Sequence, residues 1–244
     1  MKKHLKGIDR MKRRVGRRRS FSMTLLLAAF FVLSSSVLTS CKEENDAVEE
    51  FPNWKDKNEK YFDNLYQQTK QKIASGDKSW KIITKWSLNE EIATKAVDHI
   101  VVHVLKEGTG SGCPLYTDSV RVNYSGRMLP STSYPAGFVF DKSYYGDFDP
   151  KTAHPVTLAM QGQRAVVDGF STALQHMHIG DRWEIYIPHQ LGYGADGSRN
   201  STTKAYIVQP YSTLIFDVTL LAYYRPGEIP VPFQAKQNAV WVEE

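Results

Sequence analysis

Residues 166–197 constrain the fold more than any other part of this chain. They read VVDGFSTALQHMHIGDRWEIYIPHQLGYGADG, which combines the patterns of a short amphipathic helix, a glycine turn, one alternating strand and a loop of aromatic and glycine residues. The stretch holds no nucleophile paired with a base and no spacing typical of metal ligands. The sequence therefore predicts a pocket that acts by its shape and by excluding water.

The helix of this stretch has one apolar face about two turns long. Phe170, Ala173, Leu174 and Met177 occupy positions i, i+3, i+4 and i+7. We expect Asp168 to be the N-cap and Gly180 to end the helix.

Four segments have the pattern of strands. Residues 98–105 are apolar on both faces, whereas residues 120–125, 181–187 and 212–221 alternate between apolar and polar positions, and Gly126 is expected to end the first of these three. Alternation of this kind indicates an antiparallel sheet with one face in solvent. A short helix and a sheet, each with one apolar face, are expected to pack together as an α+β domain.

The segments on either side of this domain are simpler. Residues 54–75 place Trp54, Tyr61, Leu65, Thr69 and Ile73 near helical spacing, with Phe62 and Tyr66 beside them and Gly76 as a stop, which predicts one helix whose stripe packs on the domain or on a second copy. We expect a short strand within 78–89 and an extended, proline-rich tail over 225–244, in which Val240, Trp241 and Val242 can dock as an edge strand.

Composition allows one compact domain with appendages, since 41% of the 244 residues are hydrophobic. The formal charge of +5 is concentrated at one end. Residues 1–40 hold ten of the 31 Lys and Arg residues and one of the 26 Asp and Glu residues, so the rest of the chain has a net charge of −4. That balance lacks the clustered cations that phosphate backbones require, and we expect no nucleic-acid partner.

The basic end leads into a targeting signal. The run KRRVGRRRS precedes a mainly apolar stretch of about sixteen residues at 23–38, which is short for a membrane span and typical of a signal peptide over residues 1–40. The next residues, Leu38-Thr39-Ser40-Cys41, resemble the lipobox of bacterial lipoproteins, in which cleavage before the cysteine frees it for lipidation. An uncleaved anchor is the alternative.

Lipidation of Cys41 predicts attachment to the outer membrane, on its periplasmic or its surface face. Residues 42–46, KEEND, are similar to the acidic export tags of Bacteroidetes surface lipoproteins, and a plain charged tether over 41–53 is the other interpretation. Cys113 then has no cysteine partner, so we expect no disulfide.

Other chemistries lack the residues that they need. His176 and His178 point in different directions on a regular helix, Ser171 and Ser212 lack a nucleophile elbow, and the carboxylates Asp181, Asp196 and Asp217 cannot be paired as acid and base. The glycines of 108–112 are not followed by the helix of a dinucleotide site. We therefore expect no metal and no cofactor.

Three segments together resemble the FKBP-type peptidyl-prolyl cis-trans isomerases: residues 118–126 (DSVRVNYSG), 166–197, and 207–221 (IVQPYSTLIFDVTLL). The resemblance runs from about Asp98 to Tyr223 and implies an FKBP-like antiparallel sheet wrapped around one short helix. The corresponding domains are an N-terminal helical extension over 54–95 and an isomerase domain over 96–224. The implied substrates are proline-containing polypeptides among secreted or envelope proteins, and macrolides are the implied inhibitors.

The resemblance also implies roles for ten residues. The implied catalytic residues are Tyr124, Phe140, Asp141, Tyr193, whose hydroxyl donates to the bound carbonyl, and Phe216. The implied substrate-binding residues are Val156, Val166, Val167, Phe170 and Val208.

This sequence departs from the family pattern in two ways. Phe170 stands where the family usually has tryptophan, and Val156 stands at a position that is usually aromatic. Residues 130–138 and 143–154 are longer than the common pattern, and we expect them to cover or reshape the pocket mouth. Two functions stay open: an isomerase, and a peptide-binding chaperone or surface module on the same fold with little or no turnover.

Overall fold

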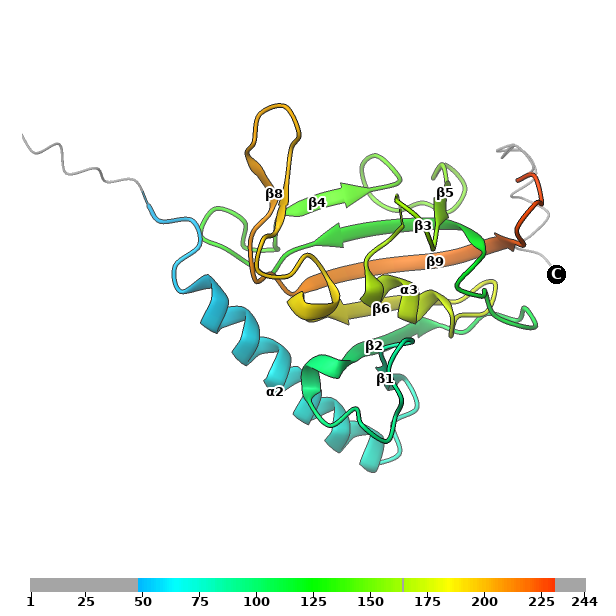
Figure 1. The fold of residues 1–244 in the computed structure, drawn as a ribbon, viewed down its shortest axis with the longest axis horizontal. Coiled ribbons are helices and arrows are strands. Elements are labelled where there is room, and N and C mark those ends of the chain that lie inside the picture. Colours follow the sequence, from blue (N-terminus) through cyan, green and yellow to red (C-terminus); the bar gives the residue numbers. More distant parts are fainter. Residues whose placement is uncertain (1–47, 164, 231–244) are drawn as a thin grey trace, which may run out of the picture. The chain divides into compact units, whose positions relative to one another are not determined.

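The computed structural model describes residues 48–163 and 165–230, and its centre is one antiparallel sheet (Figure 1). Its strand order is β1 (Trp80–Thr84), β2 (His99–Lys106), β6 (Arg182–Ile187), β9 (Leu214–Tyr224), β3 (Ser119–Arg127) and β4 (Val139–Lys142), while β5 (Val156–Ala159) also pairs with β3. β4 and β5 divide one edge of β3 between them, because β4 pairs with its end and β5 with its beginning. The predicted α+β class with an antiparallel sheet is confirmed.

Helix α3 (Asp168–Leu174) lies on one face of this sheet and contacts β2 and β6 (Figure 1). Its predicted apolar face is confirmed, since Phe170, Ala173 and Leu174 are buried. Gly169 allows the close approach, because a Cβ there would lie 2.3 Å from Cγ2 of Ile187. The core therefore sits between α3 and the inward side chains of the strands, which include Val102, Val122, Ile185, Leu214 and Val218.

Helix α2 (Trp54–Ala74) packs against β1 and β2, so the expectation that its stripe is packing surface is confirmed. Trp54 and Phe62 are buried, whereas Ile73 is 41% exposed. The stripe includes a residue that periodicity did not predict: Asn58 is fully buried, and its side-chain oxygen accepts a hydrogen bond of 2.8 Å from the backbone N–H of Thr213. The helix ends before Gly76, which has a φ of +91°, as expected.

The short strand expected within 78–89 is β1, and it extends the sheet by pairing with β2 from Trp80 opposite His103 to Thr84 opposite His99. The N-terminal extension thus contributes an edge strand as well as a helix. β2 is buried on both faces near its start, where α3 and α2 both contact it.

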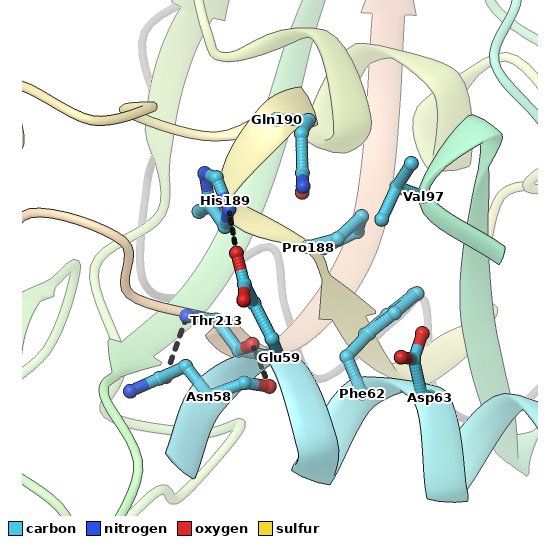
Figure 2. Close-up of a pocket in the computed structure, with 9 residues that line it drawn as sticks. All are labelled: Asn58, Glu59, Phe62, Asp63, Val97, Pro188, His189, Gln190 and Thr213. Atoms are coloured by element: carbon cyan, nitrogen blue, oxygen red, sulfur yellow. Dashed lines mark hydrogen bonds and ion pairs between the residues drawn. The ribbon is translucent and has the colours of Figure 1, made fainter. Parts of the chain in front are cut away.

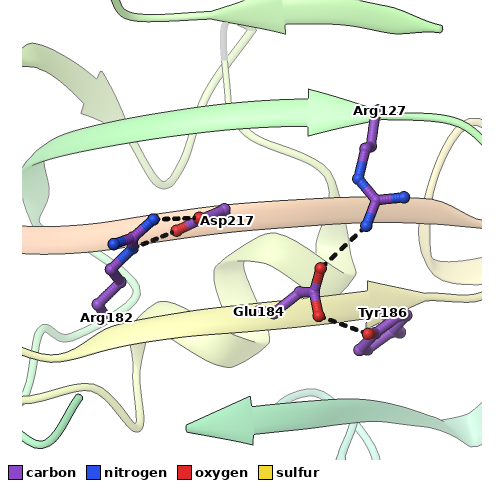
Figure 3. A network of polar contacts seen from close by, with 5 residues as sticks. All are labelled: Arg127, Arg182, Glu184, Tyr186 and Asp217. Atoms are coloured by element: carbon purple, nitrogen blue, oxygen red, sulfur yellow. Dashed lines mark hydrogen bonds and ion pairs between the residues drawn. The ribbon is translucent and has the colours of Figure 1, made fainter. Parts of the chain in front are cut away.

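The face of the sheet that carries Arg182, Glu184 and Tyr186, here called the outer face, bears a polar network (Figure 3). Arg182 donates two hydrogen bonds, of 2.9 and 2.7 Å, to the carboxylate of Asp217. Glu184 accepts from Arg127 at 2.9 Å and from the Tyr186 hydroxyl at 2.5 Å. These polar partners agree with the prediction of one polar sheet face.

The prediction that Gly126 ends its strand is wrong, because β3 continues to Arg127. Gly126 lies opposite Asp141 on one side and Phe216 on the other. A Cβ at this position would lie 2.6 Å from a ring atom of Phe216 and 2.7 Å from one of Phe140. Glycine is thus needed here for the packing of two rings against the strand.

Two predictions about the ends of α3 are also wrong. Val167 is the N-cap and Asp168 is the first helical residue, with its carboxylate 2.8 Å from the ammonium of Lys85. The helix ends at Leu174, and Gly180, with a φ of +96°, forms the turn before β6, where it packs on Gly108.

Four short strands escaped prediction: β4, β5, and the separate hairpin of β7 (Ser198–Arg199) and β8 (Tyr206–Val208). Two 3-10 turns, η1 (Ala96–Asp98) and η2 (His189–Leu191), complete the elements. The first tail residues turn rather than extend, with Arg225 bound at 2.5 Å to the fully buried carboxylate of Asp118. The predicted signal peptide, Cys41 and the edge strand at 240–242 lie outside the described residues.

Candidate functional site

A cavity of about 170 Å³ opens at one end of α3. Aromatic and aliphatic side chains line most of it, and they come from β3, β4, β5, β9, α3 and two loops. The lining residues are Tyr124, Phe140, Asp141, Leu158, Ala165, Val166, Val167, Phe170, Tyr193 and Phe216.

Four of these rings pack against one another. The centroids of Phe170 and Phe216 lie 4.7 Å apart, Phe140 meets Phe216 edge to face at 5.5 Å, and Tyr124 lies 6.1 Å from Phe170. Contacts of this kind fix ring orientations beyond what apolar burial alone achieves. The cavity therefore has a rigid aromatic wall, which Gly126 allows to sit close to β3.

One carboxylate stands in this apolar wall. Asp141 accepts a hydrogen bond of 2.6 Å from the Tyr124 hydroxyl. Burial raises the pKa of Tyr124, and the bond to Asp141 raises it further, so this hydroxyl stays a donor at neutral pH. The Tyr124–Asp141 pair is thus a fixed polar group at the cavity.

Tyr193 is the second polar group of the wall. Its side chain is 38% exposed, and burial followed by the charge of Asp141 raises the pKa of its hydroxyl. Among residues 48–163 and 165–230 this hydroxyl has no hydrogen-bond partner, which leaves a protonated donor available to a bound molecule.

The structure brings eight of the ten predicted site residues into this one wall. The other two are not among the lining residues: Val156 pairs with Val122 in the sheet, and Val208 is buried at 1% exposure. Prediction missed Leu158 and Ala165. Leu158 could have been predicted from its position two residues after the predicted site residue Val156, because alternate residues of a strand share a face.

The two long segments lie elsewhere. In 130–138, Ser131 and Ser133 hydrogen-bond the carboxylate of Glu50. In 143–154, Phe148 lies under the guanidinium of Arg182 on the outer face, 4.8 Å from its ring centroid. No lining residue of the cavity comes from either segment, so the expectation that they form the pocket mouth gains no support.

The histidines and the cysteine considered for other chemistry have ordinary structural contacts. His176 and His178 contact the carbonyl oxygens of Thr172 and Gly112 through Nδ1, at 2.9 and 3.0 Å. Cys113 lies 3.6 Å from His178, and burial raises the pKa of its thiol, which disfavours the thiolate. Within the described ranges no cluster of three or more His, Cys, Asp or Glu side chains is arranged to hold a metal ion, and no helix is long and apolar enough to cross a membrane.

Comparison with known proteins links this geometry to one family. The sequence model described as FKBP-type peptidyl-prolyl cis-trans isomerase matches residues 113–221. The chain is 36% identical over 119 residues to the "Peptidyl-prolyl cis-trans isomerase Mip" of Coxiella burnetii, covering 49% of this chain and 42% of that protein. It is 33% identical over 136 residues to the "Macrophage infectivity potentiator" of Trypanosoma cruzi, covering 56% and 59%. The chain thus spans about half the length of these relatives.

Among solved structures, a peptidyl-prolyl cis-trans isomerase from Pseudomonas syringae aligns with 67% of this chain and 96% of its own. The identity is 22% and the TM-score is 0.42.

Proposed function

Residues 113–221 make this chain a member of the FKBP-type peptidyl-prolyl cis-trans isomerase family, and from this membership we propose that the protein catalyses cis-trans isomerisation of Xaa-Pro bonds. The observation that carries the proposal is the convergence of eight predicted site residues on one apolar cavity with two hydroxyl groups at its wall. Proline-containing polypeptides are the proposed substrates.

Isomerisation needs no nucleophile, because no covalent bond is broken. The barrier of ~18–20 kcal/mol comes from resonance of the planar amide, and rotation removes that resonance. The planar amide is also more dipolar than the twisted one, so an apolar wall disfavours the ground state relative to the transition state. The rings of Phe140, Phe170 and Phe216 supply such a wall.

In this proposal the polar groups hold the substrate in register. Tyr193 donates to the carbonyl of the bound peptide, and the Tyr124–Asp141 pair fixes one side of the cavity. A barrier lowered by about 5–7 kcal/mol corresponds to roughly four to five decades of rate, which shape, desolvation and one or two hydrogen bonds supply together.

A protease-free isomerisation assay on a series of short Xaa-Pro peptides tests this function, with the full-length protein in the presence and absence of rapamycin. We expect a rate enhancement that rapamycin suppresses. A folded protein without enhancement on any peptide would overturn the isomerase and favour the alternative, a peptide-binding module on the same fold.

We further propose that a lipidated Cys41 holds the domain at the outer membrane, where it assists the folding of envelope or secreted proteins. The lipobox-like residues 38–41 support this anchor. We expect Cys41→Ala to move the protein from the membrane fraction to the soluble fraction. Unchanged fractionation of that variant would refute the anchor without affecting the proposed activity.

A further inference from the structure

The backbone on both sides of Tyr193 is tied to a single carbonyl group. The carbonyl oxygen of His189 accepts hydrogen bonds from Gly192 at 3.0 Å and from Gly194 at 2.8 Å. The carbonyl of Gly194 in turn accepts from Tyr211 at 2.9 Å. The position of Tyr193 in the cavity wall therefore depends on where His189 lies.

Figure 2 shows Glu59 of α2 reaching the imidazole of His189, and the ring of Tyr211 also contacts this imidazole. Its side chain is 12% exposed, and its Nε2 lies 3.4 Å from Oε1 of Glu59 on α2. The ring of Tyr211 meets it edge to face at 5.1 Å. Within the part of the chain that the structure describes, Glu59 provides the one ion-pair contact of His189, and neither ring nitrogen makes a hydrogen bond.

The same part of α2 is fixed to the chain around Tyr211. The indole N–H of Trp54 donates to the hydroxyl of Ser212 at 2.9 Å. The side-chain oxygen of Asn58 accepts from the backbone N–H of Thr213 at 2.8 Å (Figure 2). Lys55 lies 5.0 Å from the centroid of the Tyr211 ring. The first turns of α2 are thus fixed to the chain that carries Tyr211, and they also carry Glu59, so both residues that contact the imidazole of His189 are held in place.

We propose that α2 positions Tyr193 for catalysis, through the contact of Glu59 with His189 and the two hydrogen bonds that His189 accepts. Glu59 and His189 are positioning residues, since neither lines the cavity of the candidate site. The inference rests on the proposed function, because it assigns α2 a part in the same isomerisation.

The charges around His189 agree with a supporting role for Glu59. Burial lowers the pKa of His189, Glu59 opposes this shift, and Lys55 adds to it. Glu59 and Asp63 of α2 line the small cavity beside the imidazole, and Tyr211 faces the ring from the other side. Neither ring nitrogen of His189 makes a hydrogen bond within the described residues, so the contact with Glu59 is electrostatic. Removing Glu59 takes away the carboxylate that contacts the buried imidazole, and the ring and the backbone attached to it are expected to shift.

The test is a double-mutant cycle in the full-length protein, with kcat/KM for a short Xaa-Pro peptide as the readout. We expect Glu59→Ala to lower kcat/KM roughly two- to fivefold through kcat, because misplacement of a catalytic group by ~1 Å can cost up to 10²-fold. The loss should be no larger than that of Tyr193→Phe, since Glu59 acts only through Tyr193. Glu59→Gln should recover part of the loss, because it keeps the side chain's size and a polar oxygen beside Nε2 of His189. In the Tyr193→Phe protein, Glu59→Ala should have no further effect.

Asp63→Ala is the matched control, because it removes an exposed carboxylate one turn further along α2. Losses that add in the double variant, or an equal loss in Asp63→Ala, would overturn the positioning role while leaving the proposed function intact. An inactive wild-type protein would instead overturn the proposed function and the catalytic part of this inference. Hydrogen exchange then decides the structural part: in Glu59→Ala the Gly194 amide should exchange faster while that of Ile185 in β6 is unchanged, and equal protection at Gly194 would refute it.

Discussion

Replacing Gly126 by alanine should destabilise the protein and distort its cavity. The added Cβ would lie 2.6 Å from Phe216 and 2.7 and 2.9 Å from two ring atoms of Phe140, so both rings must move by several tenths of an ångström. Overpacking of this kind costs about 1–3 kcal/mol. Backbone entropy acts in the opposite direction, because Gly→Ala at a compatible site stabilises by about 0.4–1 kcal/mol. We expect a net loss of about 1–2 kcal/mol, or a Tm lower by about 2–8 °C.

Thermal unfolding and the isomerisation assay measure the two consequences. Because the displaced rings belong to the cavity wall, kcat/KM should fall roughly tenfold at temperatures where the variant is folded. Phe140→Leu removes the two ring atoms of Phe140 that the new Cβ would meet, so the two changes together should cost less than the sum of their separate effects. A Tm that rises in Gly126→Ala, as backbone entropy alone predicts, would refute the packing described here.

Three further predictions concern single side chains. Tyr193→Phe should lower kcat/KM roughly two- to twelvefold, the value of one hydrogen bond of ~0.5–1.5 kcal/mol, and leave Tm nearly unchanged because the hydroxyl is at a loop; loss of the fold instead would contradict its place in the wall. Burial raises the pKa of Tyr124, so above pH ~10 the unfolded state loses its proton first and stability falls; urea unfolding at increasing alkaline pH should show a smaller fall in Tyr124→Phe, and an identical fall would count against this burial. Burial lowers the pKa of His189 below its usual 6.5, so as pH falls through that value the unfolded state takes up the proton first and stability decreases; His189→Gln should lose this component between pH 7 and 5, and equal pH profiles would show that His189 is not buried in solution.

The long strands could be predicted because apolar side chains recur regularly along most of their length. The alternation of Trp183, Ile185 and Ile187 survives intact in β6. β4 and β5 are short and mostly half-buried or exposed, so their residues show no alternation to detect. Gly126 was misjudged for a related reason: its neighbours Phe140 and Phe216 are distant in sequence, and only the fold shows that their rings occupy the space of a side chain.

The lining of the candidate cavity could be anticipated where a family resemblance implied roles for residues, whereas periodicity alone would have assigned Phe170 or Phe216 to the core. The support behind Tyr193 could not be predicted in this way. Glu59 appears as an ordinary charge on a helix and His189 as a loop residue, and only packing of α2 on the domain brings them within 3.4 Å.

The position of β9 has a consequence for biosynthesis. This strand is the last described element of the chain, yet it pairs with β6 on one side and β3 on the other. Until the ribosome has released residues 214–224, the earlier strands have no central partner and the Phe216 side of the cavity does not exist. The sheet must therefore stay open until residues 214–224 have emerged, and its non-local pairing makes the closing step slow compared with that of a helical protein of the same size. Until then its unpaired strand edges and apolar side chains are exposed and prone to aggregation. The protein's own folding therefore meets the same difficulty as the folding of its proposed client proteins.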